Sequence, residues 1–376
     1  MGSPLVSCAS VESAWFAHQL EEANGQFRHD WTRGLERAEF GHIQQSWEHA
    51  VLKSRTGWEA SCVGIRQGEI LAGALILSKR TPVGSLTTVP CGPWWQAGCR
   101  DLLPTVLDMV TEYCRSQRAL FCRYHLPMPG PAFEEIRPLL PKQHRVRPHV
   151  WSYWNLARAV AVIDIRGRLD EVIGRMHHQT RRNYRLSLRN GVSVRHGGPE
   201  DLRAVYELLR TRLGKKDVAV RDFEYFEQLF TAYPKDRLVL CLAEAAGKLA
   251  AFQMVARLGR TSFLLYAAMD DAQRNLFPAT AAEIGAIDWS IQHGCTVYDL
   301  GGTCTGWPPK ETDKGYGVWR HKMHMGAVAE LHAPYCDIPV APLGTLAVRL
   351  GEDAALPFAM ERGFSKFRVA YERLTA

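Results

Sequence analysis

The chain has 376 residues, of which 46% are hydrophobic and 23% are charged, and its formal net charge is +7. This composition is typical of folded globular domains and excludes an intrinsically disordered or collagen-like chain. The length exceeds what one compact core usually holds and predicts two domains. The longest apolar runs, such as Ile70 to Leu77, are too short to cross a bilayer, so we expect no membrane span.

The first residues, MGSPLVSCAS, contain neither a basic region nor an apolar stretch, which predicts that no signal peptide is present. The ten cysteines form no CxxC pair, and several lie in apolar runs, where cysteine packs as a small hydrophobic residue. We therefore expect reduced thiols in a cytoplasmic protein, without a disulfide framework or a zinc site. His177 and His178 are adjacent on a predicted helix and would point apart, so we expect no metal between them.

An internal repeat relates the two halves of the chain. The segment CVGIRQGEILAGALIL from Cys62 matches CLAEAAGKLAAFQMV from Cys241, and each reads as a strand, a tight turn and a second strand. A third strand, an amphipathic helix and a fourth, apolar strand follow each hairpin, and helical stretches precede it. The predicted elements are helices over 102–117, 201–213, 222–233 and 279–294, and strands over 119–126 and 296–302.

This order of elements, found twice, predicts an α/β protein of two similar domains with mixed sheets flanked by helices. The proline-rich segment 127–148 reads as a linker or surface loop between them. We expect the first domain to cover 1–150 and the second to cover 151–339. The C-terminal segment 340–376 is expected to pack back onto the first domain.

A basic stretch without any acidic residue runs from Val172 to Pro199. On a helix, Arg181, Arg185 and Arg189 would fall one turn apart and form a stripe. A solvated helix face is the simplest interpretation of such a stripe. Because no acidic residues are interleaved, contact with a polyanion, most simply with phosphates, is an equally good one.

The segment GVWRHKMHMG, 317–326, follows an apolar strand that ends in two glycines. Its alternation predicts a compact strand that places Arg320, Lys322 and His324 on one face. Trp319, His321, Met323 and Met325 would then anchor the other face in the core. Such a strand would hold Lys322 rigidly beside the site.

The plan of elements is that of the acetyltransferase (GNAT) fold, in which a loop of the form [QR]-x-x-G-x-[GA] holds the pyrophosphate of CoA. Glycine lets backbone N–H groups approach the phosphates in such a loop. The corresponding stretch here, DAQRNLFPAT, contains no glycine. An acyl-CoA-dependent N-acyltransferase is therefore the second choice.

Four blocks in order resemble the FemABX aminoacyl transferases, which are tandem GNAT-like proteins that use aminoacyl-tRNA. They are QQSWEHAVLKSRTGWE from Gln44, QTRRNYRLSLRNGVSV from Gln179, TRLGKKDVAVRDFEYF from Thr211, and YDLGG with GVWRHKMHMG from Tyr298. The resemblance covers most of the chain. It implies that Lys322 stabilises the oxyanion of the tetrahedral intermediate, which a fixed cation in a dry site can do. With such a donor, the basic stretch that holds Arg181, Arg182, Arg185 and Arg189 is predicted to bind the phosphates of the tRNA.

The resemblance further implies that Lys53, Lys215 and Lys216 hold the phosphates of the acceptor. One departure lies in the family's Arg-Gly-Pro-x-x-Asp segment, which reads CGPWWQ here, with Cys91 for the arginine and Gln96 for the aspartate. Because of this departure, we expect the acceptor to be a peptide or nucleoside natural product rather than a cell-wall precursor. The remaining candidates for substrate contact are Trp94, Trp95, Tyr266, Tyr298 and Asp299. Both tryptophans could instead be core or lid residues.

The sequence thus predicts an aminoacyl-tRNA-dependent transferase that forms an amide bond on a small acceptor, with no cofactor, no metal and no DNA partner. Positioning of the two substrates would supply much of the rate. In a structural alternative, Lys322 merely pairs with an acid such as Asp299. A third class is a catalytically silent tandem GNAT protein that binds tRNA or a nucleotide sugar.

Overall fold

The computed structural model describes residues 14–19, 25–81, 84–147, 159–214, 220–304, 307–313 and 315–350. The chain divides into two compact units, one of Met1–Leu156 with His332–Ala376 and one of Ala157–Leu331. The second unit therefore ends at Leu331 rather than at residue 339. The chain returns to the first unit before residue 340 because β15 (Tyr335–Ile338) pairs with strands of the first sheet.

The first unit is built around one mixed sheet in the strand order β1-β2-β3-β4-β6-β15-β7, with β5 paired to β3. All its pairs are antiparallel except β4 with β6. Its elements besides β15 are β1 (Ala14–Gln19), α1 (Gly25–Glu36), α2 (Trp47–Ser54), β2 (Glu59–Gln67), β3 (Glu69–Thr81), β4 (Gly84–Val89), β5 (Trp94–Trp95), α3 (Leu103–Ser116), β6 (Ala119–His125), α4 (Gly130–Ile136), β7 (Arg145–Arg147) and α11 (Pro342–Leu350).

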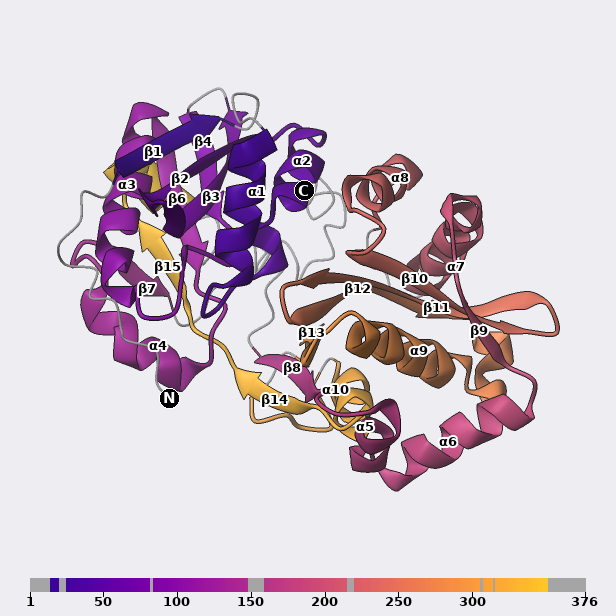
Figure 1. The fold of residues 1–376 in the computed structure, drawn as a ribbon. Helices are drawn as coiled ribbons and strands as arrows, with labels where there is room; N and C mark the ends of the chain where they lie inside the picture. Colours follow the sequence, from indigo (N-terminus) through magenta and orange to yellow (C-terminus); the bar gives the residue numbers. More distant parts are fainter. Residues whose placement is uncertain are drawn as a thin grey trace. The chain divides into compact units, whose positions relative to one another are not determined.

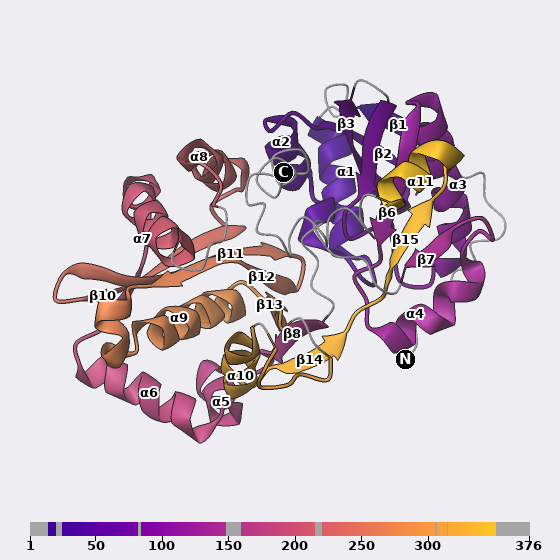
Figure 2. The same cartoon turned by 180° about the vertical axis from the view of Figure 1, so that it is seen from behind.

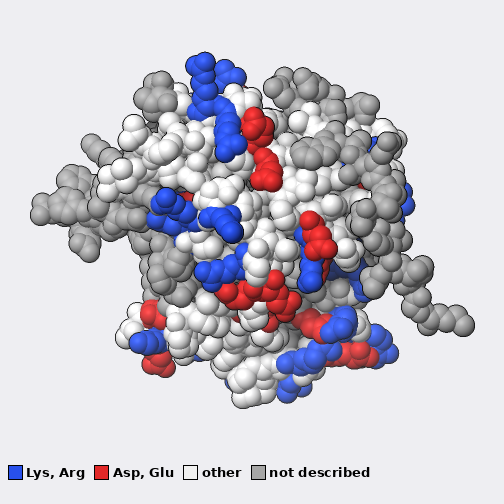
Figure 3. All heavy atoms as spheres, turned by 90° about the vertical axis from the view of Figure 1, so that its left-hand side faces the viewer, with Lys and Arg blue, Asp and Glu red and all other residues white. Residues whose placement is uncertain are grey.

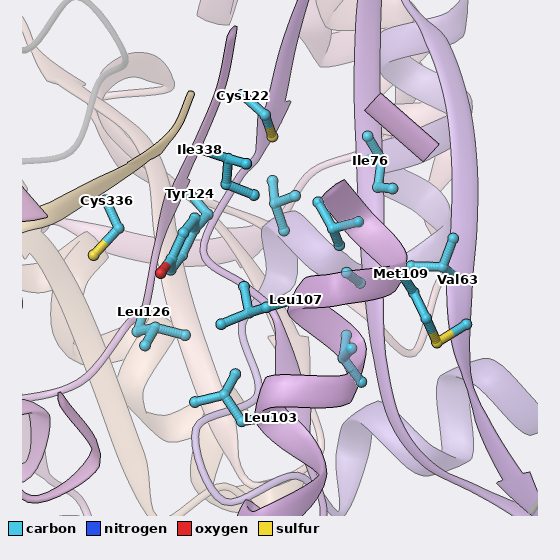
Figure 4. Packing of buried hydrophobic residues seen from close by; sticks show 14 of the residues in the cluster. Val63, Ile76, Leu103, Leu107, Met109, Cys122, Tyr124, Leu126, Cys336 and Ile338 are labelled. Atoms are coloured by element: carbon cyan, nitrogen blue, oxygen red, sulfur yellow. The ribbon is translucent and has the colours of Figure 1, made fainter. Parts of the chain in front are cut away.

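Helix α3 packs its apolar side against β2, β3 and β6 and forms the main core of this unit (Figure 4). Leu103, Leu107 and Val110, at most 1% exposed, recur at helical spacing along it. The returning strand β15 is fixed to β6 by a buried ion pair, in which Arg123 donates to both carboxylate oxygens of Asp337 at 2.7 and 3.1 Å. Helix α11 follows β15 and lies beside β6 (Figure 2).

The second unit has a sheet in the strand order β14-β8-β13-β12-β11-β10-β9. All its pairs are antiparallel except β12 with β13. Helix α9 covers one face of this sheet, and α7 and α8 lie over the other (Figure 1). Its elements are β8 (Ala159–Asp164), α5 (Leu169–Arg175), α6 (His178–Arg189), β9 (Ser193–His196), α7 (Leu202–Gly214), α8 (Phe223–Ala232), β10 (Leu238–Ala245), β11 (Lys248–Leu258), β12 (Thr261–Met269), α9 (Pro278–Gln292), β13 (Val297–Gly302), α10 (Tyr316–His324) and β14 (Val328–Leu331).

The predicted repeat and fold class are confirmed. Hairpin β2–β3 corresponds to β10–β11, and each is followed by a strand, a helix and a parallel strand of the same sheet. Both hairpin turns place a glycine in the left-handed region, Gly68 at φ 71° and Gly247 at φ 72°. A side chain at either position would be strained, which is why glycine recurs in both halves.

Two local predictions are wrong. The proline-rich segment 127–148 contains α4 and β7, so it is part of the first unit's fold rather than a linker. The segment expected as a strand near residue 320 is helix α10. Gly315, at φ 90°, starts this helix, and a nine-residue helix can alternate basic and apolar residues without being a strand.

No helix among the described residues is long and apolar enough to cross a membrane. The nine described cysteines are free and buried, in keeping with their position in apolar runs.

Candidate active site

The two parallel strands in the middle of the second sheet pair only briefly and then separate. Residues Thr261–Phe263 of β12 pair with Val297–Asp299 of β13, and within the described chain the pairing stops there. The register of β12 against β11 shifts just beyond this point, between Met254 and Val255, so a bulge bends β12. The unpaired strand backbone can donate hydrogen bonds to a bound acyl or peptide group.

Lys322 of α10 lies under the end of β13 and is 7% exposed. Its ammonium donates to the carbonyl oxygens of Leu300, Gly301 and Gly302 at 2.5, 3.2 and 2.6 Å. Gly301, at φ 69°, allows these three carbonyls to turn toward one cation. Burial lowers the pKa of Lys322 to about 8, against the nearby charges of Glu283 and Asp299, which raise it.

The structural alternative for Lys322, an ion pair with Asp299, is not observed in the described chain. Asp299 instead accepts the N–H of Gly301 at 2.6 Å, and burial raises its pKa to about 6 despite the opposing effects of that hydrogen bond and of Lys322. The two charges still interact at longer range. Lys322 and Asp299 together fix the backbone where β13 turns away from β12.

Glu283 is a carboxylate in the first half of α9 and is 2% exposed. It lies 3.0 Å from Nε2 of His321, whose own side chain is 49% exposed. The charge and hydrogen bond of Glu283 raise the pKa of His321, against burial and Lys322, which lower it. The buried carboxylate thus holds a half-exposed imidazole in a fixed orientation.

A polar pocket of about 720 Å³ opens on the exposed side of His321. It lies between α6, α10, the start of α9 and the 3-10 helix Asp271–Leu276. The guanidinium groups of Arg274 and Arg320 have no ion-pair partner among the described residues. The lining residues are Gln179, Thr180, Asn183, Arg274, Thr280, Gly317, Arg320, His321 and His324. Basic side chains at a helix N-terminus favour an anionic ligand such as phosphate.

The pocket residues of α10 share one helix face, at 317, 320, 321 and 324. This i, i+3, i+4, i+7 spacing is visible in the sequence, yet the strand interpretation placed His321 opposite Arg320 and His324. Glu283 was also missed. Its signal is one acidic residue near the start of an otherwise apolar stretch, ATAAEIGAI, which on a buried helix requires a partner.

The predicted arginine stripe on α6 is partly wrong. Arg181 points back toward α5, where its Nη1 donates to the carbonyls of Gly174 and Met176 at 2.7 and 2.8 Å. Arg182, Arg185 and Arg189 are exposed and have no ion-pair partner in the described chain. Their spacing of three and four places them on one helix face.

Charged residues are distributed differently on α6 and on the face that Figure 3 shows. Over the face that Figure 3 shows, Lys and Arg lie among Asp and Glu, so positive charge does not gather into one broad field there. The exposed face of α6 lacks such acidic neighbours along its own helix. Helix α6 thus presents Arg182, Arg185 and Arg189 to solvent, and its Gln179, Thr180 and Asn183 line the pocket.

Three histidine rings meet where α6 and α10 join. The ring centroid of His177 lies 4.1 Å from the centroids of both His178 and His324. The expectation that His177 and His178 point apart is therefore wrong. His177 precedes α6 as its N-cap, which places it outside the helical geometry that the prediction assumed. Among the described residues no group of three or more His, Cys, Asp or Glu is arranged to hold a metal ion.

The two predicted tyrosines differ in what they can contact. Tyr298 is 0% exposed inside the core of the second unit, so the prediction that it contacts substrate is wrong. Tyr266 is half-buried beside the bulge of β12, and its ring lies 4.7 Å from that of Phe226 in α8. Burial raises the pKa of Tyr266. It remains a candidate for substrate contact from the β12 side.

The candidates in the first unit are mostly internal. Trp94 and Trp95 are 1% and 2% exposed, and Trp94 packs edge-on against Trp31 with ring centroids 5.1 Å apart. The prediction that these two tryptophans stack on a substrate is therefore wrong, and the alternative that they are core residues is confirmed. Lys53 is half-buried, with its Nζ 5.9 Å from the ring centroid of Trp58. Lys215 and Lys216 lie outside the described residues.

The CGPWWQ departure is also internal. Cys91 is 1% exposed and its Sγ donates to Oε1 of Gln44, while Gln96 donates to the carbonyl of Ile70 at 2.8 Å. Both side chains hold the first unit together. The departure therefore gives less reason than expected to reject a cell-wall acceptor.

Two family models match this chain. Residues 30–127 match the FemAB family, and residues 174–322 match an acetyltransferase (GNAT) domain. Among curated proteins, the Lipid II:glycine glycyltransferase of Staphylococcus aureus (strain MRSA252) is 20% identical over 360 residues, covering 76% of this chain and 85% of the relative.

Solved structures share the fold. The crystal structure of FemX superposes with a TM-score of 0.76 at 19% identity, covering 85% of this chain and 98% of that chain. A tandem GNAT protein from the clavulanic acid biosynthesis pathway has a TM-score of 0.50 at 12% identity, covering 88% and 99%. At these identities the likeness supports the tandem GNAT-like fold and not a particular reaction.

Proposed function

Because the chain belongs to the FemAB family and has a tandem GNAT-like fold, we propose that it moves an amino acid from aminoacyl-tRNA to an amine of a peptidoglycan precursor. The observation that carries this proposal is the pairing, on one short helix, of a buried cation and a basic pocket. Lys322 reaches the end of β13, and Arg320, His321 and His324 open into the pocket. The Staphylococcus aureus relative is named for glycyl transfer to lipid II, which favours a cell-wall acceptor over a natural product.

In this proposal the pocket binds the phosphates of the tRNA acceptor end. Arg274, Arg320 and the start of α9 supply positive charge, and the exposed face of α6 extends it. Each phosphate neutralised by such a group releases counterions, so binding should depend steeply on salt. The ester carbonyl would lie where β12 and β13 separate, close to the end of β13 that Lys322 holds.

Lys322 serves this reaction in two ways. Its three carbonyl contacts fix the backbone on one side of the gap between the strands. Its charge, in a buried setting, stabilises the oxyanion that forms when the amine attacks the ester. The 3.2 Å contact to Gly301 is the longest of the three and the one that would be exchanged for the oxyanion.

The acetyl-CoA alternative uses the same fold but needs a glycine-rich phosphate loop. In its place the chain has the 3-10 helix Asp271–Leu276, which ends at Phe277 in the left-handed conformation before α9 begins. The pocket beside it depends on side chains rather than on glycine backbone for positive charge. This chemistry fits a nucleic acid end better than a tightly cradled pyrophosphate.

The test is a transfer assay with the purified protein. Total tRNA charged with amino acids is supplied with a nucleotide-linked muramoyl pentapeptide or its lipid-linked form, and adducts are identified by mass spectrometry. Parallel reactions contain acetyl-CoA, or uncharged tRNA. An adduct that needs charged tRNA supports the proposal. Acetylation without tRNA would establish the alternative, and binding of both substrates without turnover would indicate a silent binding protein.

A further inference from the structure

Resting on the proposed function, we infer that His321 is the general base of the transfer and that Glu283 is its positioning residue. His321 lines the pocket, and its neighbour Lys322 holds the end of β13. The imidazole is therefore the proton acceptor closest along α10 to the cation that the reaction uses. The proposal adds a proton pathway to a reaction otherwise explained by positioning and charge.

The geometry is that of an oriented imidazole. Nε2 of His321 lies 3.0 Å from Oε2 of Glu283, and a carboxylate at this distance accepts the Nε2–H. The neutral ring then carries its lone pair on Nδ1, which has no hydrogen-bond partner among the described residues. Because Glu283 is 2% exposed and His321 is 49% exposed, the buried partner orients and the exposed partner can meet a substrate.

His324, by contrast, lacks a carboxylate partner. It lines the same pocket one turn further along α10, but its ring stacks on His177, and burial and the surrounding positive charges lower its pKa. A histidine in that setting accepts a proton less readily near neutral pH. His321 therefore has the carboxylate partner that raises the pKa of a general base, and His324 does not.

The step balances as follows. The neutral acceptor amine attacks the ester carbonyl, a C–N bond forms, and the carbonyl oxygen becomes the oxyanion. Nδ1 of His321 takes a proton from the resulting ammonium nitrogen. The bond from the carbonyl carbon to the ribose oxygen then breaks, and the imidazolium returns its proton to that oxygen. No oxidant, reductant or further reactant is consumed.

Charged and titratable groups from several elements surround His321, and of these Glu283 raises its pKa while Lys322 lowers it. They are Glu283 from α9, Arg320, Lys322 and His324 on α10, Arg274 from the 3-10 helix before α9, and His177 and His178 at the start of α6. Glu283 alone among them is negative. Since Glu283 raises the pKa of both His321 and Lys322, Glu283→Gln should move both limbs of the pH profile of kcat/KM to lower pH. The pKa of the acceptor amine also enters this profile, but the substitution leaves it unchanged.

The experiment compares His321→Ala, His321→Gln and Glu283→Gln with the wild-type enzyme in single-turnover transfer from charged tRNA. We expect each His321 variant to lose about 100- to 10,000-fold in rate, the usual contribution of general acid–base catalysis. Added imidazole should restore part of the rate of His321→Ala only. His293→Gln, at the opposite end of α9, is the control and should retain full activity. Thermal melting and tRNA binding are measured in parallel.

Several outcomes would overturn the inference. They are a folded His321→Ala enzyme of wild-type rate, a lowered rate that tracks only weaker tRNA binding, and a Glu283→Gln profile with unmoved limbs. Imidazole rescue with an unmoved profile would also remove Glu283 from the mechanism. If the wild-type protein itself does not transfer amino acids from tRNA, the proposed function fails first, so the two failures are distinguishable.

Discussion

Replacing Lys322 with methionine should abolish most of the turnover while leaving the protein folded. Methionine fills the space of the lysine stem but cannot bind the carbonyls of Leu300, Gly301 and Gly302. Each of the two closely bound carbonyls left without a partner costs about 1–3 kcal/mol. In the wild-type protein, burial of the Lys322 charge costs about 3 kcal/mol, because its pKa is lowered from 10.5 to about 8. The methionine variant avoids this cost. These opposing effects should change the free energy of unfolding by at most a few kcal/mol.

The effect on catalysis should be much larger than the effect on stability. Loss of one preorganised oxyanion donor typically lowers the rate about 100- to 1000-fold. The assay is single-turnover transfer from charged tRNA, with thermal melting of the same samples. Lys248→Met, which removes an exposed lysine at the start of β11, is the matched control and should behave as wild type. Wild-type turnover in a folded Lys322→Met protein would refute the role of this cation.

Three further predictions test the basic helix and the first unit. Alanine at Arg182, Arg185 and Arg189 together should weaken tRNA binding and flatten its salt dependence; an unchanged salt slope would return this face to ordinary solvated surface. Trp94→Ala should destabilise the first unit by about 3–5 kcal/mol without a specific rise in acceptor KM, since Trp94 is a core residue; a raised KM with unchanged melting would restore it to the acceptor site. His125 is buried, and burial with the nearby His332 and His42 lowers its pKa to about 3. The unfolded chain therefore takes up a proton below pH 6.5 that the folded chain refuses, so stability should fall as pH drops from 6.5 toward 3, by up to about 1.4 kcal/mol per pH unit for this residue. Denaturant melts of His125→Gln should show a shallower acid slope, and equal slopes would contradict the assignment.

The sequence by itself determined the architecture. Apolar periodicity, the paired turns at Gly68 and Gly247 and the constant order of elements were enough to predict two α/β domains and the bounds of α3, α7, α8 and α9 to within two residues. These signals are local, since helix and strand periods and left-handed glycines depend on neighbouring residues. The prediction that Lys322 is catalytic came from the family resemblance rather than from its spacing.

Only the tertiary structure decided which side chains can meet a ligand. Helix α10 alternates basic and apolar residues, so its sequence fits a strand as well as a helix, and packing selected the helix. That choice brought His321 beside Glu283, 38 positions away in the chain. Tertiary contacts likewise bind Arg181 to the carbonyls of Gly174 and Met176 and leave Arg182 exposed. Burial of Trp94, Trp95 and Tyr298 likewise depends on what packs over them, which no local pattern specifies.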